Sequence, residues 1–280
     1  MSDRIIKVIQ IVVYTNLWIG LGAGVITWQY YLIFDLEPNL DIILLAFFAT
    51  VLTYSFQRFV KLMNPAQSGG ERLEWMRENP IIVRGIMILS LVGCVVFLLK
   101  VSLATYLFLV VAGLMSLFYV IKTPWISGRS LRDIPTLKIF LIAFVWSATG
   151  TFLPWLNTEF YPKEIPWLLF VIYFLFVLAI TLPFDIRDIY LDEPDKKTIP
   201  QRIGEGKTRV LSVILLIGQL AIFSIVFGDW PALLTFFTAL SVFLILRSKS
   251  DTNDLYFSFV IDGLLILQGL VIYYDKLFFL

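Results

Sequence analysis

Three aspartates, Asp185, Asp188 and Asp192, end a long apolar segment at spacings that place side chains on one face of an α-helix. Clustered carboxylates repel one another unless a cation neutralises them. Their oxygen atoms suit Mg²⁺, which commonly bridges to phosphate oxygens. The three residues therefore predict a metal site for a phosphorylated substrate. The alternative is a solvated helix end whose charges pair with neighbouring basic residues.

The composition of the chain indicates the environment in which these aspartates lie. The chain has 280 residues, of which 59% are hydrophobic and 15% charged, unlike a typical soluble domain. Apolar segments long enough to cross a bilayer recur throughout, so we expect a single membrane domain over residues 1–280, surrounded by membrane lipids. The absence of His and the single Cys argue against zinc, haem and disulfide chemistry. A net charge of +1 gives no reason to expect nucleic-acid binding.

The apolar segments predict an all-α, polytopic bundle of about nine transmembrane helices. The predicted helices are Val8–Phe34, Leu40–Val60, Ile81–Leu99, Ser102–Ile121, Ile134–Leu156, Pro166–Phe184, Val210–Phe227, Pro231–Leu246 and Leu255–Tyr274.

The basic residues predict the orientation of this bundle. Of the 22 Lys and Arg, all but Lys100, Lys163 and Lys276 fall on the side that holds the N-terminus. Because Lys and Arg are retained in the cytoplasm during insertion, we expect a cytoplasmic N-terminus and an external C-terminus in a plasma membrane, such as the bacterial inner membrane. The aspartate cluster and the longer loops then lie on the cytoplasmic side, where we look for the site.

The sequence around the aspartates resembles that of a known family. Asp185 to Asp192 has the form D-x-x-D-x-x-x-D at the end of the sixth helix, and Thr198-Ile199-Pro200 and then Gly204 follow in order. This run is similar to the second acidic motif of the UbiA superfamily of membrane prenyltransferases. The resemblance implies a UbiA-like domain over the whole chain. It also implies that Asp185, Asp188 and Asp192 are catalytic residues that bind Mg²⁺ and thereby an isoprenyl diphosphate, whose prenyl group passes to an aromatic or other lipophilic acceptor. On that basis, Asp188→Ala should abolish Mg²⁺-dependent binding.

The first acidic motif of that family, N-D-x-x-D-x-x-x-D, is missing. The matching stretch, residues 53–62 at the end of the second helix, contains no carboxylate, and Arg58 and Lys61 stand there instead. Either these cations hold the diphosphate directly, or catalysis has been lost. The second alternative leaves a non-catalytic UbiA-like membrane protein that binds an isoprenoid lipid or a protein partner. Glu71, Glu74 and Glu78 could supply carboxylates from the next loop, but a solvated amphipathic helix is favoured there because basic residues interleave them.

Other polar residues on the same side are weaker candidates. Tyr119 and Lys122 close the fourth helix, where the resemblance implies a Tyr and a Lys, although the spacing here is one residue shorter. Lys138 opens the fifth helix and could reach a phosphate. With Arg58 and Lys61, these residues form the expected substrate-binding set, and the alternative for the lysines is contact with lipid head groups. Asp262 lies inside the last helix, where we expect a structural hydrogen bond, with proton handling as the alternative.

Overall fold

The structure of this chain is a computed structural model, which describes residues 3–63, 70–122, 128, 130–134, 136–158, 165–191, 197–228 and 232–279. Every regular element in these residues is helical. The α-helices are α1 (Asp3–Tyr14), α2 (Leu17–Ile33), α3 (Leu40–Leu62), α4 (Glu71–Glu78), α5 (Pro80–Leu98), α6 (Leu103–Phe118), α7 (Leu137–Trp155), α8 (Ile165–Arg187), α9 (Ile199–Ile203), α10 (Glu205–Phe227), α11 (Ala232–Leu246) and α12 (Asp262–Phe279). A 3₁₀ turn, η3 (Leu131–Asp133), precedes α7, and a π-helix, η5 (Tyr256–Ile261), runs into α12.

The chain is a multi-pass integral membrane protein, as its composition predicts. Within the described residues, six helices are long and apolar enough to cross a membrane, namely α3, α5, α7, α8, α10 and η5 with α12. The bent pair of α1 and α2 would make a seventh. The helices α6 and α11 are apolar but shorter, with 16 and 15 residues. The all-α fold is confirmed, and the predicted count of nine is reached only when these two shorter helices are included.

The prediction of a single helix over Val8–Phe34 is wrong. The chain breaks after α1, and the axes of α1 and α2 differ by 64°. Asn16 occupies the break with a left-handed backbone (φ 66°), a conformation that Asn tolerates better than most residues. The side-chain amide of Asn16 donates a hydrogen bond to Ser55 Oγ on α3 (3.0 Å). The break therefore directs the polar side chain of Asn16 towards the interior of the bundle.

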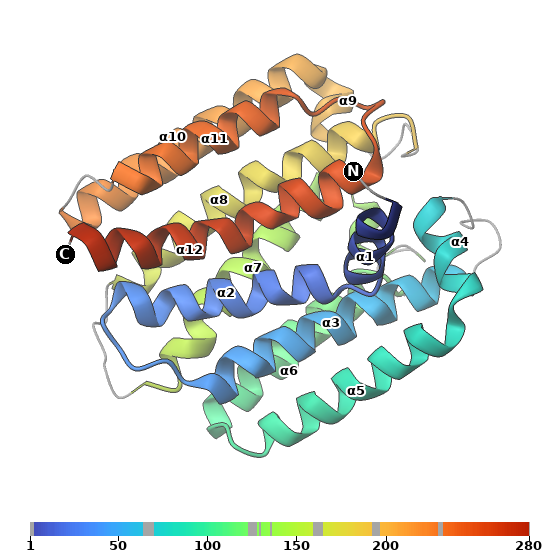
Figure 1. Ribbon diagram of the computed structural model, residues 1–280, viewed down its shortest axis with the longest axis horizontal. Helices are drawn as coiled ribbons and strands as arrows, with labels where there is room; N and C mark the ends of the chain where they lie inside the picture. Colours follow the sequence, from blue (N-terminus) through green and yellow to red (C-terminus); the bar gives the residue numbers. More distant parts are fainter. Residues whose placement is uncertain are drawn as a thin grey trace.

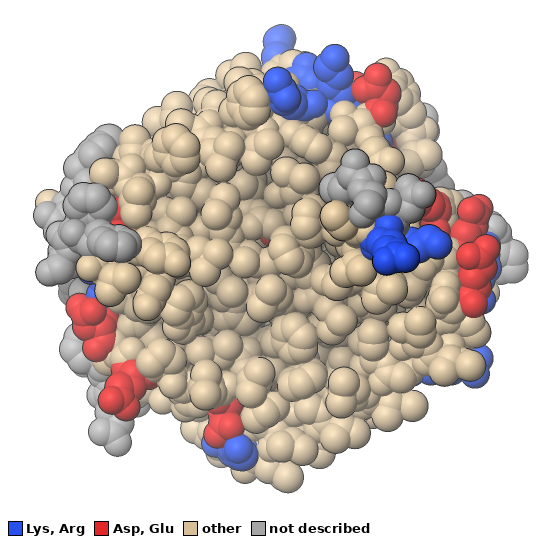
Figure 2. Space-filling view, viewed as in Figure 1, with Lys and Arg blue, Asp and Glu red and all other residues tan. Residues whose placement is uncertain are grey.

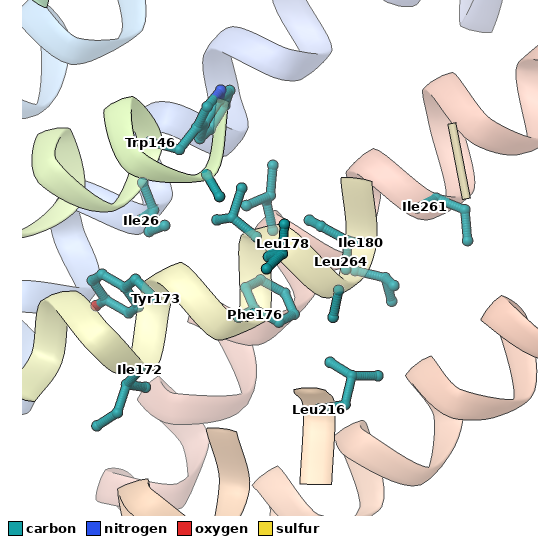
Figure 3. Packing of buried hydrophobic residues seen from close by; sticks show 14 of the residues in the cluster. Ile26, Trp146, Ile172, Tyr173, Phe176, Leu178, Ile180, Leu216, Ile261 and Leu264 are labelled. Carbon is teal, nitrogen blue, oxygen red and sulfur yellow. The ribbon is translucent and has the colours of Figure 1, made fainter. Parts of the chain in front are cut away.

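The helix α8 forms the centre of the bundle, packed between α7 and α10, while α2 lies between α3 and α12 (Figure 1). Figure 3 shows the core around α8, where Phe176 and Leu178 lie among Trp146 of α7, Leu216 of α10 and Leu264 of α12. The N-terminus, α4 and α9 lie at one end of the bundle, and the C-terminus lies at the other (Figure 1). Figure 2 shows a wide uncharged surface between charged side chains near the rim, as contact with lipid requires.

Local sequence explains several helix ends and one close crossing. The Asn39 side chain caps α3 by accepting hydrogen bonds from the backbone N–H groups of Asp41 and Ile42. Pro80 begins α5, a position where its missing N–H costs nothing. Gly93 of α5 faces the Phe48 ring of α3 so closely that an added Cβ would lie 2.6 Å from it. Small residues of this kind allow membrane helices to pack closely.

Candidate functional site

A polar cavity of about 180 Å³ lies at the end of the bundle that holds α4. Its walls come from α2, α3, α4, α7, α8 and α12, from the α1–α2 break and from the segment between α6 and α7. Six cationic side chains and two carboxylates line it: Arg58, Lys61, Arg72, Arg132, Lys138, Arg187, Asp188 and Asp262. We call this space the cationic cavity. Its charge favours an anionic ligand.

Three of the six cationic side chains lie at the C-terminal ends of two helices, α3 and α8. Arg58 and Lys61 stand one turn apart near the end of α3, and Arg187 ends α8. The C-terminus of a helix carries a partial negative charge, which favours cations at these positions. The same partial charge disfavours the carboxylates of Asp185 and Asp188 at the end of α8, so these two groups require cationic partners.

Lys138 and Arg187 supply those partners. Lys138 Nζ lies 2.8 Å from Asp185 Oδ1 and 3.7 Å from Asp188 Oδ2. The Arg187 guanidinium binds Asp188 Oδ1 (2.7 Å) and Asp254 Oδ1 (2.6 Å). Burial alone would raise the pKa of Asp188, but the charge and hydrogen bond of Arg187, followed by the charge of Lys138, lower it to about 2. Two of the three carboxylates of the motif, Asp185 and Asp188, are therefore paired with cations of the chain itself.

These contacts bear on the expected Mg²⁺. In the part of the chain that the structure describes, no group of three His, Cys, Asp or Glu side chains could hold a metal ion. Asp185 and Asp188 do not fit a resident Mg²⁺ as they stand, because ammonium and guanidinium groups occupy the oxygen atoms that would bind it. Asp192 lies outside the described residues, so the three-aspartate metal site stays a prediction.

Four cations of the cavity form no ion pair with any carboxylate in the part of the chain that the structure describes. The side chains of Arg58, Lys61 and Arg132 make no hydrogen bond or ion pair with any described residue, and the Nε atoms of both arginines are buried. Arg72 donates to two uncharged oxygens, Val13 O (2.7 Å) and Asn16 Oδ1 (2.5 Å), while its own Nε is buried without a partner. Buried donors of this kind are usually satisfied, so these four groups indicate a site for an anion.

The structure places the expected residues as follows. Arg58, Lys61, Lys138, Tyr119 and Asp188 line the cationic cavity, and buried Asp185 binds Lys138 behind it.

Lys122 is exposed and does not belong to the lining residues. Glu71, Glu74 and Glu78 are exposed on α4, and this helix instead directs Arg72 into the cavity. Asp262 lines the cavity without a side-chain hydrogen bond to another described residue, contrary to the structural role expected for it. Arg72 and Arg187 line the same cavity.

Sequence reasoning missed Arg72 and Arg132 as members of the site. Arg132 belongs to η3, which a capping box holds in place: the hydroxyl and backbone N–H of Ser130 both donate to Asp133 Oδ2 (2.7 and 3.0 Å). The backbone N–H of Arg132 also donates to Tyr119 O (3.3 Å). The Ser-x-x-Asp sequence before α7 is the one local signal that could have indicated an ordered turn here.

A second, apolar cavity of about 390 Å³ adjoins the first between α3, α5, α6 and α7. Four residues line both cavities: Tyr54, Gln57, Tyr119 and Ile142. At this junction the Trp146 indole donates a hydrogen bond to Tyr54 Oη (3.1 Å). The two spaces together would accept a molecule with a charged head and an apolar tail.

Comparison with known proteins identifies the fold. No protein-family model matches the sequence, and no curated protein matches it either. Among solved structures, a UbiA homolog from Archaeoglobus fulgidus bound to GPP and Mg²⁺ is similar with a TM-score of 0.61 and 11% identity, over 94% of this chain and 99% of that one. The same homolog bound to DMAPP and Mg²⁺ gives 0.52 and 15%, over 92% and 98%. A digeranylgeranylglyceryl phosphate synthase gives 0.55 and 12%, over 96% of each chain. The chain therefore has the fold of the UbiA superfamily, as its acidic motif suggested.

Proposed function

From the UbiA fold and the two adjoining cavities, we propose that this protein binds an isoprenyl diphosphate and transfers its isoprenyl group to an aromatic or other lipophilic acceptor. The diphosphate would lie in the cationic cavity and the isoprenyl tail in the apolar one. The observation that carries the proposal is the junction, where Tyr54, Gln57, Tyr119 and Ile142 line both spaces. In cells, the cationic cavity would face the cytoplasm, as the distribution of Lys and Arg predicts.

The chemistry follows from what surrounds the bond that must break. When the carbon–oxygen bond to the diphosphate opens, the electron pair leaves with the diphosphate and an allylic carbocation remains. Fixed cations around the leaving group stabilise its growing negative charge. The apolar walls exclude water, which would otherwise capture the carbocation. Tyr54, Tyr119 and Trp146 stand beside the position where that carbocation would form, and aromatic rings attract cations.

A second function has an observation of its own. The end of α3 carries Arg58 and Lys61 where the resemblance implies carboxylates, and this change is what loss of catalysis would leave behind. In that case, the protein is a non-catalytic membrane protein that binds an isoprenoid lipid or a protein partner. Only the enzyme would release pyrophosphate in the presence of an acceptor, so this release separates the two functions.

The test uses the purified full chain in detergent with labelled geranylgeranyl diphosphate and a set of lipophilic aromatic acceptors. We expect pyrophosphate release that depends on an acceptor, together with a labelled product. The variant Arg58→Gln should lose this release, whereas Arg84→Gln, which changes an exposed arginine of α5, should keep it. Binding without release would favour the non-catalytic function. Absence of binding would contradict the proposal.

A further inference from the structure

The charges around the cationic cavity do not balance. Lys138 and Arg187 are paired with Asp185, Asp188 and Asp254. This leaves four cations that form no ion pair with a described carboxylate, which we call the open cations: Arg58, Lys61, Arg72 and Arg132. Asp262 is the one lining carboxylate that no ion pair joins to a described residue. Among the described residues that line the cavity, positive charges therefore outnumber negative ones, the reverse of a carboxylate-rich metal site.

The open cations surround the cavity from three elements. Arg58 and Lys61 come from α3, Arg72 from α4 and Arg132 from η3. The positive charge of Arg58 repels those of Arg72 and Arg132. The carboxylates of Asp254 and Asp262 oppose this repulsion without forming an ion pair with these arginines. A buried charge without a partner is costly, so such a cluster indicates a ligand that supplies negative charge.

Hydrogen bonds hold the side chain of one open cation and the backbone turn that carries another. The Arg72 side chain donates to Val13 O and Asn16 Oδ1, which lie at the break between α1 and α2. Arg132 is fixed by the capped turn of η3. In both arginines the buried Nε atom makes no hydrogen bond to a described residue. A planar guanidinium donates two parallel hydrogen bonds to a phosphate group, which makes it a suitable partner for a diphosphate.

We infer that the open cations hold the substrate's diphosphate directly, so that its binding does not require a bridging Mg²⁺. The inference rests on the function proposed above, because it concerns how the same ligand is held. It follows from the donor set: Mg²⁺ would add positive charge among side chains that already repel one another. A diphosphate supplies negative charge and would accept hydrogen bonds from the guanidinium and ammonium groups that line the cavity.

Removal of the divalent ion is the direct test. Binding of labelled geranylgeranyl diphosphate to the purified full chain is measured in EDTA and again in Mg²⁺. We expect the two dissociation constants to agree within about threefold, which is a small difference in free energy. Geranylgeraniol, which lacks the diphosphate, and inorganic pyrophosphate, which lacks the tail, should both bind more weakly than the complete molecule.

Variants of α4 test the contribution of the open cations. Arg72→Gln should weaken binding in EDTA by about tenfold or more, as expected for loss of a hydrogen bond to a charged group. Arg77→Gln is the matched control, because Arg77 lies on the same helix, is exposed and does not line the cavity. It should bind like the unchanged protein.

Asp188→Asn separates direct binding from binding through a metal. If the open cations hold the diphosphate, removing this negative charge should leave the affinity unchanged or raise it, because Arg187 and Lys138 lose a competing partner. If Mg²⁺ held by the aspartates binds the diphosphate, the same variant should abolish binding.

The outcomes distinguish the inference from the function on which it rests. Binding that appears only with Mg²⁺, or that Asp188→Asn abolishes in a folded protein, would overturn the inference and leave the proposed function standing. No binding with or without Mg²⁺ would overturn both. Equal binding in EDTA and Mg²⁺, lost in Arg72→Gln and kept in Arg77→Gln, would support both. The EDTA measurement needs no variant, so it stands even if a substitution prevents folding.

Discussion

Asn16 lies at the break between α1 and α2 and also contacts Arg72, which lines the cationic cavity. Its left-handed conformation ends α1, and its side chain lies between Ser55, to which it donates (3.0 Å), and Arg72, from which it accepts (2.5 Å). Beside the break, Val13 O accepts hydrogen bonds from Arg72 (2.7 Å) and from the backbone N–H of Asn16 (3.1 Å). Asn16 therefore acts through Arg72 as a positioning residue, without a proposed contact to substrate of its own.

A double-mutant cycle tests this coupling. Asn16→Gly keeps a residue that tolerates the left-handed backbone and removes the amide that holds Arg72. We expect it to weaken binding of geranylgeranyl diphosphate, and the double variant with Arg72→Gln to bind about as weakly as Arg72→Gln alone, because both changes remove one interaction. Effects that add fully would show that Asn16 does not act through Arg72.

The pKa of Asp188 predicts how stability depends on pH. Its value is lowered from 3.8 in the unfolded chain to about 2 in the folded protein. The stabilisation is therefore present above about pH 4 and is lost as the pH falls towards 2, and it amounts to about 2 kcal/mol. In detergent, acidification over this window should lower the melting temperature of the unchanged protein more than that of Asp188→Asn. An equal decrease in both would contradict the pairing of Asp188 with Arg187 and Lys138.

At the level of single residues, the sequence predicted part of the candidate site. Residues at the ends of predicted helices, such as Arg58, Lys61 and Lys138, line the cavity because their helices end there. Arg72 could not be distinguished from its neighbour Arg77, because the direction of a short amphipathic helix depends on packing. The buried side chains of Leu73 and Met76 decide it.

The elements themselves were predicted better than their interruptions. Each of the nine apolar segments contains a helix, because a bilayer-spanning length of apolar residues has few other solutions in lipid. The break at Asn16 was missed because neither Gly nor Pro marks it, and the surrounding residues are apolar. Its cause is tertiary: a hydrogen bond to Ser55, 39 residues later in the chain.

Helix packing predicts opposite outcomes for two glycines of α5. A Cβ added at Gly93 would lie 2.6 Å from the Phe48 ring of α3, whereas one added at Gly85 would meet nothing within 4 Å. Gly93→Ala should therefore destabilise the protein by about 1–3 kcal/mol through overpacking. Gly85→Ala should be neutral or stabilising, since Ala favours a helix more than Gly does. Thermal unfolding in detergent measures both, and equal melting temperatures would show that α3 and α5 do not cross this closely.

The molecule as a whole has two unlike ends. The end with α4 and the N-terminus holds the cationic cavity, and the other holds the C-terminus (Figure 1). The excess of Lys and Arg towards the first end predicts that it faces the cytoplasm. An isoprenyl diphosphate would then reach the cavity from the cytoplasmic side, while its tail remains among apolar side chains at membrane depth.

Cysteine labelling tests this orientation. Replacing the single cysteine by Cys94→Ser gives a background without thiols. In that background Arg77→Cys and Lys100→Cys place thiols beyond opposite ends of α5, at residues that are both exposed. In intact cells, a membrane-impermeant maleimide should label the cysteine at position 100 and not the one at position 77. The reverse labelling pattern would show that the protein has the opposite orientation in the membrane.

The most direct measurement of the central claim is an experimental structure of the full chain with geranylgeranyl thiolodiphosphate, an analogue that resists cleavage. The proposed function predicts that the two phosphorus atoms lie in the cationic cavity, within reach of Arg58 and Arg132. It also predicts that the isoprenyl tail passes Tyr54 and Tyr119 into the space between α3 and α6. A ligand whose head group lies outside the cationic cavity, for example beside exposed Lys122, would contradict the account.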